Sequence, residues 1–113
     1  MQKVTLTESI RGYPYLKKDA IATEFDMCKN TVSNRVKEIE KEIKAGRYSD
    51  YAIIQDGNIL LINLLVFIDY MTYRQRLQKK NLRKNVPAFR PDLIAREIGW
   101  NNRVTIFGGE DDD

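Results

Sequence analysis

The spacing of apolar residues between positions 17 and 46 predicts two helices joined by a short turn. The first helix covers residues 18–25 and the second covers residues 29–45. On a wheel of about 100° per residue, the aliphatic residues of the second helix fall within about 40° of Val32. These residues are Val32, Val36, Ile39 and Ile43. One face of the second helix is therefore predicted to enter a core.

The opposite face of the second helix is polar. It carries Asn30, Asn34, Lys37 and Lys41, with Ser33 at its flank. Asn can form two hydrogen bonds to adenine, Lys can contact guanine or a phosphate, and Ser can bond to either base. These groups therefore match the hydrogen-bonding pattern of the DNA major groove. A solvated surface helix has a similar composition, and both interpretations are open on this face alone.

The preceding residues favour DNA binding. Ala22 is small enough to let the two helices cross closely, and its spacing to Val32 is typical of helix-turn-helix proteins. The turn consists of Asp26, Met27 and Cys28. Asp26 stands where a glycine normally supplies a left-handed backbone conformation, which Asp tolerates better than most residues do. We therefore predict a DNA-binding helix-turn-helix.

A β-hairpin is predicted after the second helix. Gly46 stands where a left-handed C-cap ends a helix, and Lys44 suits the negative end of the helix dipole. Two β-prone runs, residues 51–55 and 58–62, then flank Asp56-Gly57, a dipeptide that favours a tight turn. The hairpin either lies against DNA or only covers the core, since its tip has no Lys or Arg.

Asn63 is predicted to cap a third helix that runs through residues 64–80. The face expected to pack on the second helix and the hairpin comprises Leu64, Phe67, Ile68 and Met71. Burying each such side chain contributes about 1.5 to 3 kcal/mol, which makes this helix the expected main source of core stability. A further apolar surface comprises Leu65, Tyr70 and Tyr73. It is expected to form a dimer contact or to cover the N-terminal segment.

Charge is segregated along the chain. The 113 residues include 19 Lys and Arg and 16 Asp and Glu, a formal charge of +3 that is weak evidence for nucleic acid by itself. Between residues 70 and 91, however, seven basic residues occur without an acidic one, whereas residues 110–113 are all acidic. The seven are Arg74, Arg76, Lys79, Lys80, Arg83, Lys84 and Arg90. We expect this segment to contact phosphates, the alternative being a solvated helix end and linker.

The last part of the chain predicts a short helix over residues 91–98, with Pro91 in its first turn and Gly99 after its end. Residues 103–107 are expected to form a strand or an extended tail. Phe89 and Trp100 are expected to anchor this region to the body of the protein.

The order of these elements resembles the winged helix-turn-helix of phage and mobile-element excisionases and their MerR-like relatives. The matching residues are Tyr15-Leu16, Ala20 to Ala22, Thr31-Val32, Gly46-Arg47-Tyr48 and Phe67-Ile68-Asp69-Tyr70. The resemblance covers about residues 15–71. The chain departs from the family in two respects. Its second helix is about two turns longer than usual, and the segment after Lys80 has no counterpart in the family.

The resemblance implies a mainly α fold with a small β-hairpin. Residues 1–80 would form the winged helix-turn-helix domain, and residues 81–113 would add a basic linker, a short helix and an acidic tail. The residues implied to contact bases are Lys29, Asn30, Ser33, Asn34 and Lys37. The residues expected at phosphates are Lys17, Lys18, Arg35, Lys41, Arg47, Lys79, Lys80, Arg83 and Lys84.

The implied function is non-enzymatic binding of double-stranded DNA near a recombination junction, bending it and biasing an integrase toward excision. A transcriptional repressor of the same fold is a close alternative, and a homodimer or a cooperative oligomer on DNA would accompany either role. A different class is a phage packaging component or an inhibitor of a host enzyme. Such a protein-interaction module would use Leu65, Tyr70 and Tyr73, or the acidic end, as its contact surface.

An enzyme has little support, because the sequence has no histidine, no Gly-rich phosphate loop, no CxxC motif and no paired-carboxylate motif. We predict no cofactor and no metal site. The alternating acids of the second helix are Glu38, Glu40 and Glu42. They are expected to pair with Lys41, Lys44 and neighbouring residues.

The single cysteine, Cys28, excludes an intrachain disulfide and is typical of a reducing compartment. It is expected to be a small buried cap at the turn rather than a redox-sensitive switch on DNA binding. The first residues lack the apolar run of a signal peptide, and Asn63 and Asp69 interrupt the densest apolar segment. We therefore expect a protein of the bacterial cytoplasm without a membrane segment.

Overall fold

The structure, a computed structural model, describes residues 14–99. Its elements are β1 (Tyr15–Leu16), α2 (Lys18–Glu24), α3 (Lys29–Ala45), the 3-10 turn η1 (Asp50–Ala52), β2 (Ile53–Asp56), β3 (Ile59–Asn63), α4 (Leu64–Leu77), α5 (Lys80–Arg83) and α6 (Pro91–Ile98). The predicted mainly α fold with a small β-hairpin is confirmed. The expectations for Trp100, for residues 103–107 and for the acidic end lie outside the described residues. Within residues 14–99, no helix is long and apolar enough to cross a membrane.

The two helices predicted at the start of the domain are present, and α3 has the predicted bounds. Asp26 adopts the expected left-handed conformation, with φ of 54°. The amide of Met27 then donates to the carbonyl of Ala22 at 2.9 Å and closes the turn. Gly46 ends α3 with φ of 96°, as predicted for a left-handed C-cap. Local sequence signals therefore determine both the crossing of α2 with α3 and the end of α3.

The sheet has the order β1-β3-β2 with both pairs antiparallel. The predicted hairpin is present, but Asp56 pairs with Ile59, so its central residues are Gly57 and Asn58 rather than Asp56 and Gly57. Gly57 has φ of 61°, which matches a turn with glycine at its first central position. The β-prone run also begins with η1, because the amide of Tyr51 donates to Ser49 Oγ.

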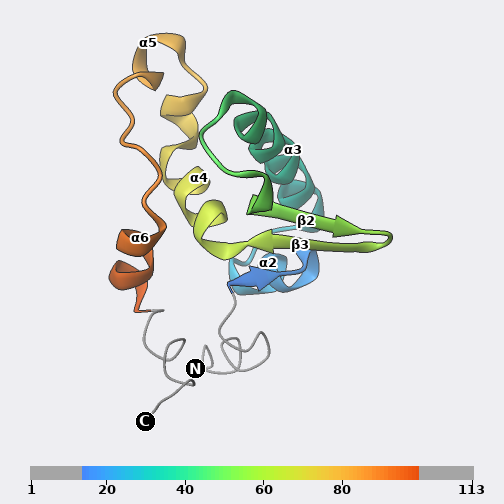
Figure 1. Cartoon of the computed structure of the whole chain (residues 1–113). Coiled ribbons are helices and arrows are strands. Elements are labelled where there is room, and N and C mark those ends of the chain that lie inside the picture. Colours follow the sequence, from blue (N-terminus) through green and yellow to red (C-terminus); the bar gives the residue numbers. More distant parts are fainter. Residues whose placement is uncertain (1–13, 100–113) are drawn as a thin grey trace.

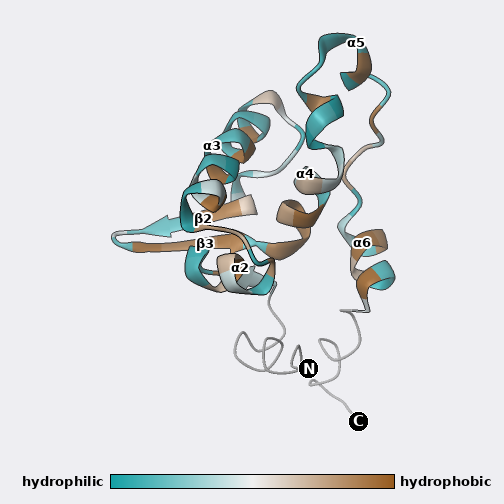
Figure 2. Ribbon diagram, turned by 180° about the vertical axis from the view of Figure 1, so that it is seen from behind, coloured by the Kyte–Doolittle hydropathy of each residue, from teal (hydrophilic) through white to brown (hydrophobic). Residues whose placement is uncertain are grey.

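The core lies between α3, the sheet and α4, and Figure 2 shows apolar residues concentrated along β3 and α4. Its largest fully buried side chains are Tyr70, Phe67, Ile21, Ile39, Ile62 and Val32. Met71, which was expected on the core face, is 38% exposed. This expectation was wrong because α4 buries the stripe through Val66, Tyr70 and Leu77, which lies about 100° from Met71.

The predicted N-cap of α4 is confirmed. Asn63 Oδ1 accepts hydrogen bonds from the amides of Leu65 and Val66 at 2.9 and 3.1 Å. The helix ends at Leu77 instead of continuing to residue 80, and α5 follows as a separate short helix. Asn63 thus starts α4 directly at the end of β3, which fixes the direction of α4 relative to the sheet.

The second apolar surface of α4 is covered by the chain itself. Leu65 and Tyr70 are 7% and 2% exposed, and Tyr73 is half-buried. Figure 1 shows α6 packed alongside α4 after the chain has returned from α5. The expectation of a dimer contact through this surface was wrong, because Leu65 and Tyr70 are buried within the chain. The alternative, that the surface covers the N-terminal segment, concerns residues that lie outside the described range 14–99.

A buried carboxylate joins the loop after α3 to α4. Asp69 is 3% exposed, and its Oδ2 accepts hydrogen bonds from Arg47 Nη2 at 2.8 Å and from the Tyr48 hydroxyl at 2.6 Å. The Tyr48 ring meets Phe89 edge-on at 5.1 Å between centroids, so the expected anchoring role of Phe89 is confirmed. Burial, and then the hydrogen bond to the carboxylate, raise the pKa of Tyr48. Asp69, Arg47, Tyr48 and Phe89 are called the Asp69 cluster below.

The Asp69 cluster yields a prediction about stability. Replacing Asp69→Ala leaves the Arg47 guanidinium and the Tyr48 hydroxyl without their acceptor, and the free energy of unfolding should fall by about 3 to 5 kcal/mol. Urea denaturation followed by circular dichroism measures this change. Asp50→Ala, at an exposed carboxylate, is the control and should change stability by less than about 0.5 kcal/mol. Equal effects of the two substitutions would show that the cluster does not hold the loop to α4.

Candidate nucleic-acid interface

Helix α3 has three distinct faces. Its apolar face enters the core, with Val32, Val36 and Ile39 at 5% exposure or less. A second face, formed by Arg35, Glu38 and Glu42, is directed toward α4 and α5. The third, called the outward stripe, comprises Asn30, Asn34, Lys37 and Lys41, all of which are exposed. These four positions follow a spacing of four, three and four residues, so they lie on one side of the helix.

Glu38 connects α3 to α4. Its Oε1 accepts hydrogen bonds from Arg74 Nε and from the Tyr70 hydroxyl, both at 2.8 Å. The bond from Arg74 is the main cause that lowers the pKa of Glu38 below its ordinary value, and the Tyr70 hydroxyl adds to the effect. Burial, with a further contribution from Glu38, raises the pKa of Tyr70 to about 12. Glu38 is therefore a charged, hydrogen-bonded group inside the fold.

Glu42 makes the corresponding connection to α5. It is 8% exposed, and its two carboxylate oxygens accept from Arg83 Nη1 at 2.8 Å and Nη2 at 2.5 Å. Arg83 Nη1 also donates to the carbonyl of Leu77 at the end of α4. This two-point contact between a guanidinium and a carboxylate is stronger and more directional than a contact to lysine.

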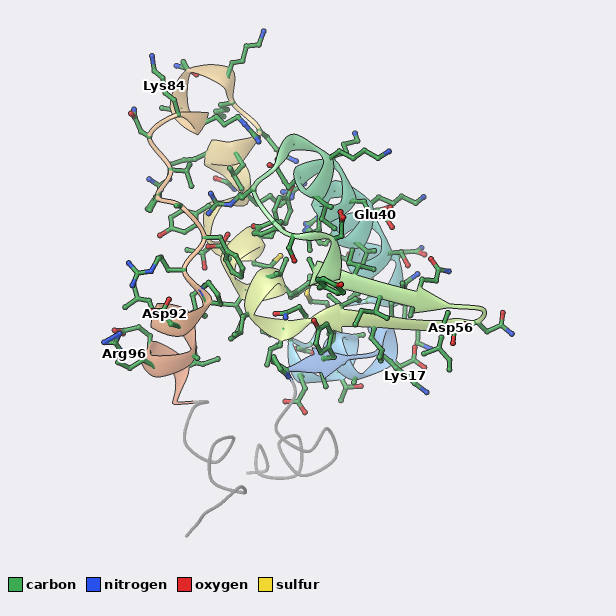
Figure 3. The ribbon with its side chains drawn as sticks, viewed as in Figure 1. Lys17, Glu40, Asp56, Lys84, Asp92 and Arg96 are labelled. Carbon is green, nitrogen blue, oxygen red and sulfur yellow. The ribbon has the colours of Figure 1, made fainter. Side chains whose placement is uncertain are left out.

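The predicted pairing of these acids with lysines of α3 was therefore wrong for Glu38 and Glu42. They lie four residues apart, on the side of the helix that faces α4 and α5, whereas the lysines lie on the solvent side. Glu40 stays exposed on α3, and Figure 3 shows its side chain projecting from the helix. Because two of three acids are turned inward, the solvent side of α3 is predominantly basic, with Lys29, Lys37, Lys41 and Lys44 all exposed.

The structure brings four of the five predicted base-contacting residues to solvent near the start of α3. Lys29, Asn30, Asn34 and Lys37 are exposed, and Lys29 Nζ lies 3.4 Å from Asp19 in a largely solvated pair. Ser33 differs, because its Oγ is half-buried and accepts a hydrogen bond from Lys18 Nζ at 3.2 Å. Lys18 and Ser33 thus connect the start of α2 to α3.

The predicted phosphate contacts separate into lysines and arginines. The side chains of Arg35 and Arg47 are 19% and 10% exposed, and each lies beside a carboxylate of the fold. Arg83 is bound to Glu42. These ion pairs argue against the three arginines as phosphate contacts, because turning toward a phosphate would break the pair of Arg35 with Glu38, of Arg47 with Asp69 or of Arg83 with Glu42. The exposed candidates are Lys17, Lys41, Lys79, Lys80 and Lys84.

The structure explains why the segment between residues 70 and 91 has basic residues and no acidic one. Of its four arginines, three bind carboxylates from other positions, namely Glu38, Glu42 and Asp92. Arg76 lies over the Tyr73 ring at 5.0 Å. Lys79, Lys80 and Lys84 remain exposed, and no ion pair within residues 14–99 includes them. In Figure 3, Lys84 lies at α5 and Lys17 lies at the far end of the molecule, beside the hairpin.

The start of α2 and the hairpin enclose an open groove of about 410 Å³ beside α3. It is lined by Lys17, Lys18, Asp19, Gln55, Gly57, Asn58, Ile59 and Leu60. Figure 1 shows the β2–β3 hairpin extending beyond the helices on this side. On the α2 side the groove has two ammonium groups and the carboxylate of Asp19, and on the hairpin side it has the amides of Gln55 and Asn58 beside two apolar residues.

Cys28 is exposed, so the expectation of a buried cap was wrong. It is the N-cap residue of α3, and the core contact in the turn is made by the half-buried Met27. Its Sγ lies 3.1 Å from Thr31 Oγ1, a hydrogen bond that is the main cause lowering the pKa of the thiol.

Comparison of the chain with protein-family models, with curated proteins and with solved structures finds no match. Within the described residues, no group of three or more His, Cys, Asp or Glu side chains is placed to hold a metal ion.

Glu38 predicts how stability depends on pH. Because its pKa is lowered in the folded protein, the ionised group stabilises the fold above its ordinary value of 4.5, and this contribution is lost as the pH falls through the folded value. At pH 7, Glu38→Gln should lower the free energy of unfolding by about 1 to 3 kcal/mol. The difference from the original protein should narrow below pH 4.5.

Urea denaturation at a series of pH values measures this dependence. Glu40→Gln removes an exposed acid from the same helix and should have an effect below about 0.5 kcal/mol at every pH. A Glu38→Gln effect that grows on acidification, or that matches the Glu40→Gln effect at pH 7, would contradict the role assigned to Glu38.

Proposed function

We propose that the protein binds double-stranded DNA by inserting α3 into the major groove. The observation that carries this proposal is the outward stripe, in which amide and ammonium groups face solvent while Glu38 and Glu42 are held on another side of the helix. A major groove admits an α-helix, and its base edges accept and donate hydrogen bonds that these groups complement. In this proposal α2, the turn and α3 act as a helix-turn-helix, and the β2–β3 hairpin is its wing.

The surroundings of α3 support the same surface. Lys17 lies at the start of α2 and Lys41 lies two turns beyond Asn34, so both flank the proposed base contacts. Neutralising a phosphate with each lysine releases counterions and makes binding depend on salt. The lysines at residues 79, 80 and 84 are proposed as a second phosphate contact, near the end of α3 to which Arg83 and Glu42 attach α5.

The biological role that we propose is that of an excisionase-type factor or a transcriptional regulator of a phage or mobile element, as the resemblance of residues 15–71 implies. Footprinting on the attachment region and promoters of such an element distinguishes the two roles. A repressor dimer protects paired half-sites about one helical turn apart. The alternative of a protein-interaction module loses one of its two expected contact surfaces, because Leu65 and Tyr70 are buried within the chain. The other surface, the acidic end, lies outside the described residues.

Salt-dependent binding to random duplexes tests the proposal. Lys41→Ala should weaken binding to every duplex and reduce the slope of log K against log[salt] by about 0.9, the change expected for one lost phosphate contact. Arg96→Ala removes one exposed charge from α6, on the other side of α4 from α3, and should leave both quantities unchanged (Figure 3).

Replacing Lys79, Lys80 and Lys84 together by Ala in the same titration tests the second phosphate contact. The slope should fall by more than it does for Lys41→Ala, and all sequences should be affected equally. Absence of duplex binding at low salt would overturn the proposed function. An effect of Arg96→Ala equal to that of Lys41→Ala would show that the proposed face of the protein is wrong.

A further inference from the structure

We propose that α3 selects duplexes in which two adenines lie one or two base pairs apart, each read by one asparagine of the outward stripe. This inference rests on the proposed DNA binding and adds the class of sequence that the protein prefers. Asn30 and Asn34 are the residues concerned, and both are exposed. No hydrogen bond within residues 14–99 engages either side-chain amide, so both amides are available to a base.

Adenine is the base that these amides match. In the major groove it presents the N7 acceptor beside the N6 donor, and an asparagine side chain can bond both at once. A guanine in the same place presents two acceptors, which leaves the amide oxygen without a donor. The exposed face therefore distinguishes A·T from G·C pairs by the hydrogen bonds that each can complete.

The other side chains of α3 that could contact a base are engaged in contacts within the protein. Arg35 is the arginine of α3, and its guanidinium lies beside Glu38 with 19% of the side chain exposed, so it is not presented to a guanine. Glu38 and Glu42, which would accept from cytosine, are bound to Arg74 and Arg83. Ser33 accepts from Lys18. Internal contacts thus leave Lys29, the two asparagines and Lys37 facing solvent in the first half of α3, and of these only the asparagines combine a donor with an acceptor.

The spacing of the two adenines follows from helix geometry. Asn30 and Asn34 are one turn apart, which is a separation of about 6 Å along the axis. Successive base pairs rise by about 3.4 Å along the duplex, so two amides at this separation reach bases one or two pairs apart. Lys37 lies about 4.5 Å farther along the helix than Asn34. It can therefore contact a guanine in the following base pair, or the phosphate beside that base.

Selection from duplexes with a randomised central segment tests this inference on the full chain. The original protein should enrich two A·T pairs at the stated spacing. Asn30→Ala and Asn34→Ala should each remove the preference at one of these positions, and only at that one. Gln75→Ala deletes an exposed side-chain amide from α4, outside the proposed interface, and should leave both preferences intact. Circular dichroism confirms that the exposed substitutions leave the fold unchanged.

Replacing one adenine by 7-deazaadenine, which lacks N7, tests the contact at the level of atoms. Binding by the original protein should weaken by about twofold to tenfold, the loss expected for one of the two hydrogen bonds of the bidentate contact. The Asn→Ala variant at the residue that contacts this base should bind the adenine and 7-deazaadenine duplexes with equal affinity. Enrichment without adenine, or preferences that survive both substitutions, would overturn this inference while duplex binding stands. Failure to bind any duplex at low salt would overturn the proposed function as well.

Discussion

The two inward-facing glutamates of α3 determine both the fold of the C-terminal part and the charge of the surface opposite. Glu38 and Glu42 bind Arg74 and Arg83, and these contacts hold α4 and α5 against α3. The same contacts take two carboxylates away from solvent, which leaves the outward stripe with amides and lysines. Removing one partner of either pair would leave the other charge unpaired in a half-buried site, which is unfavourable. Each pair therefore stabilises the packing that keeps its two partners together.

The Asp69 cluster complements this arrangement just beyond the C-terminal end of α3. Arg47 and Tyr48 follow Gly46 directly, and their bonds to Asp69 hold the end of α3 and the start of the hairpin against α4. The edge-on contact of Tyr48 with Phe89 then fixes the path of the chain toward α6. Together these contacts give α3 a rigid support, which a helix needs if its exposed side chains are to meet base edges in one register.

Much of the local structure was predictable because each signal acts within a few residues. The bounds of α3, the left-handed Gly46, the Asn63 cap and the helix over residues 91–98 all depend on neighbours in the chain. The slip of the hairpin turn by one residue reflects the pairing of Asp56 with Ile59 across the strands. Met71 and Cys28 were misplaced because the packing of α4 and the turn, not the spacing of apolar residues, decides their exposure.

The candidate site was predictable only on its exposed side. The outward stripe follows from the helical wheel, but Arg35, Arg47 and Arg83 could not be separated from the lysines by sequence. Glu38 and Arg74 are 36 residues apart, and Glu42 and Arg83 are 41 apart. Chain spacing at this range carries no signal for pairing. Among the predicted phosphate contacts, the three arginines lie beside carboxylates of the fold, whereas Lys17, Lys41, Lys79, Lys80 and Lys84 are exposed.

The most direct test of the central claim is a nuclear magnetic resonance titration of the full chain with a random duplex at low salt, which locates the binding face without any substitution. The side-chain amide resonances of Asn30 and Asn34 and the backbone resonances of the first half of α3 should shift most. Those of α6 should stay in place. Shifts centred on α6, or none on α3, would contradict the claim that the outward stripe binds DNA.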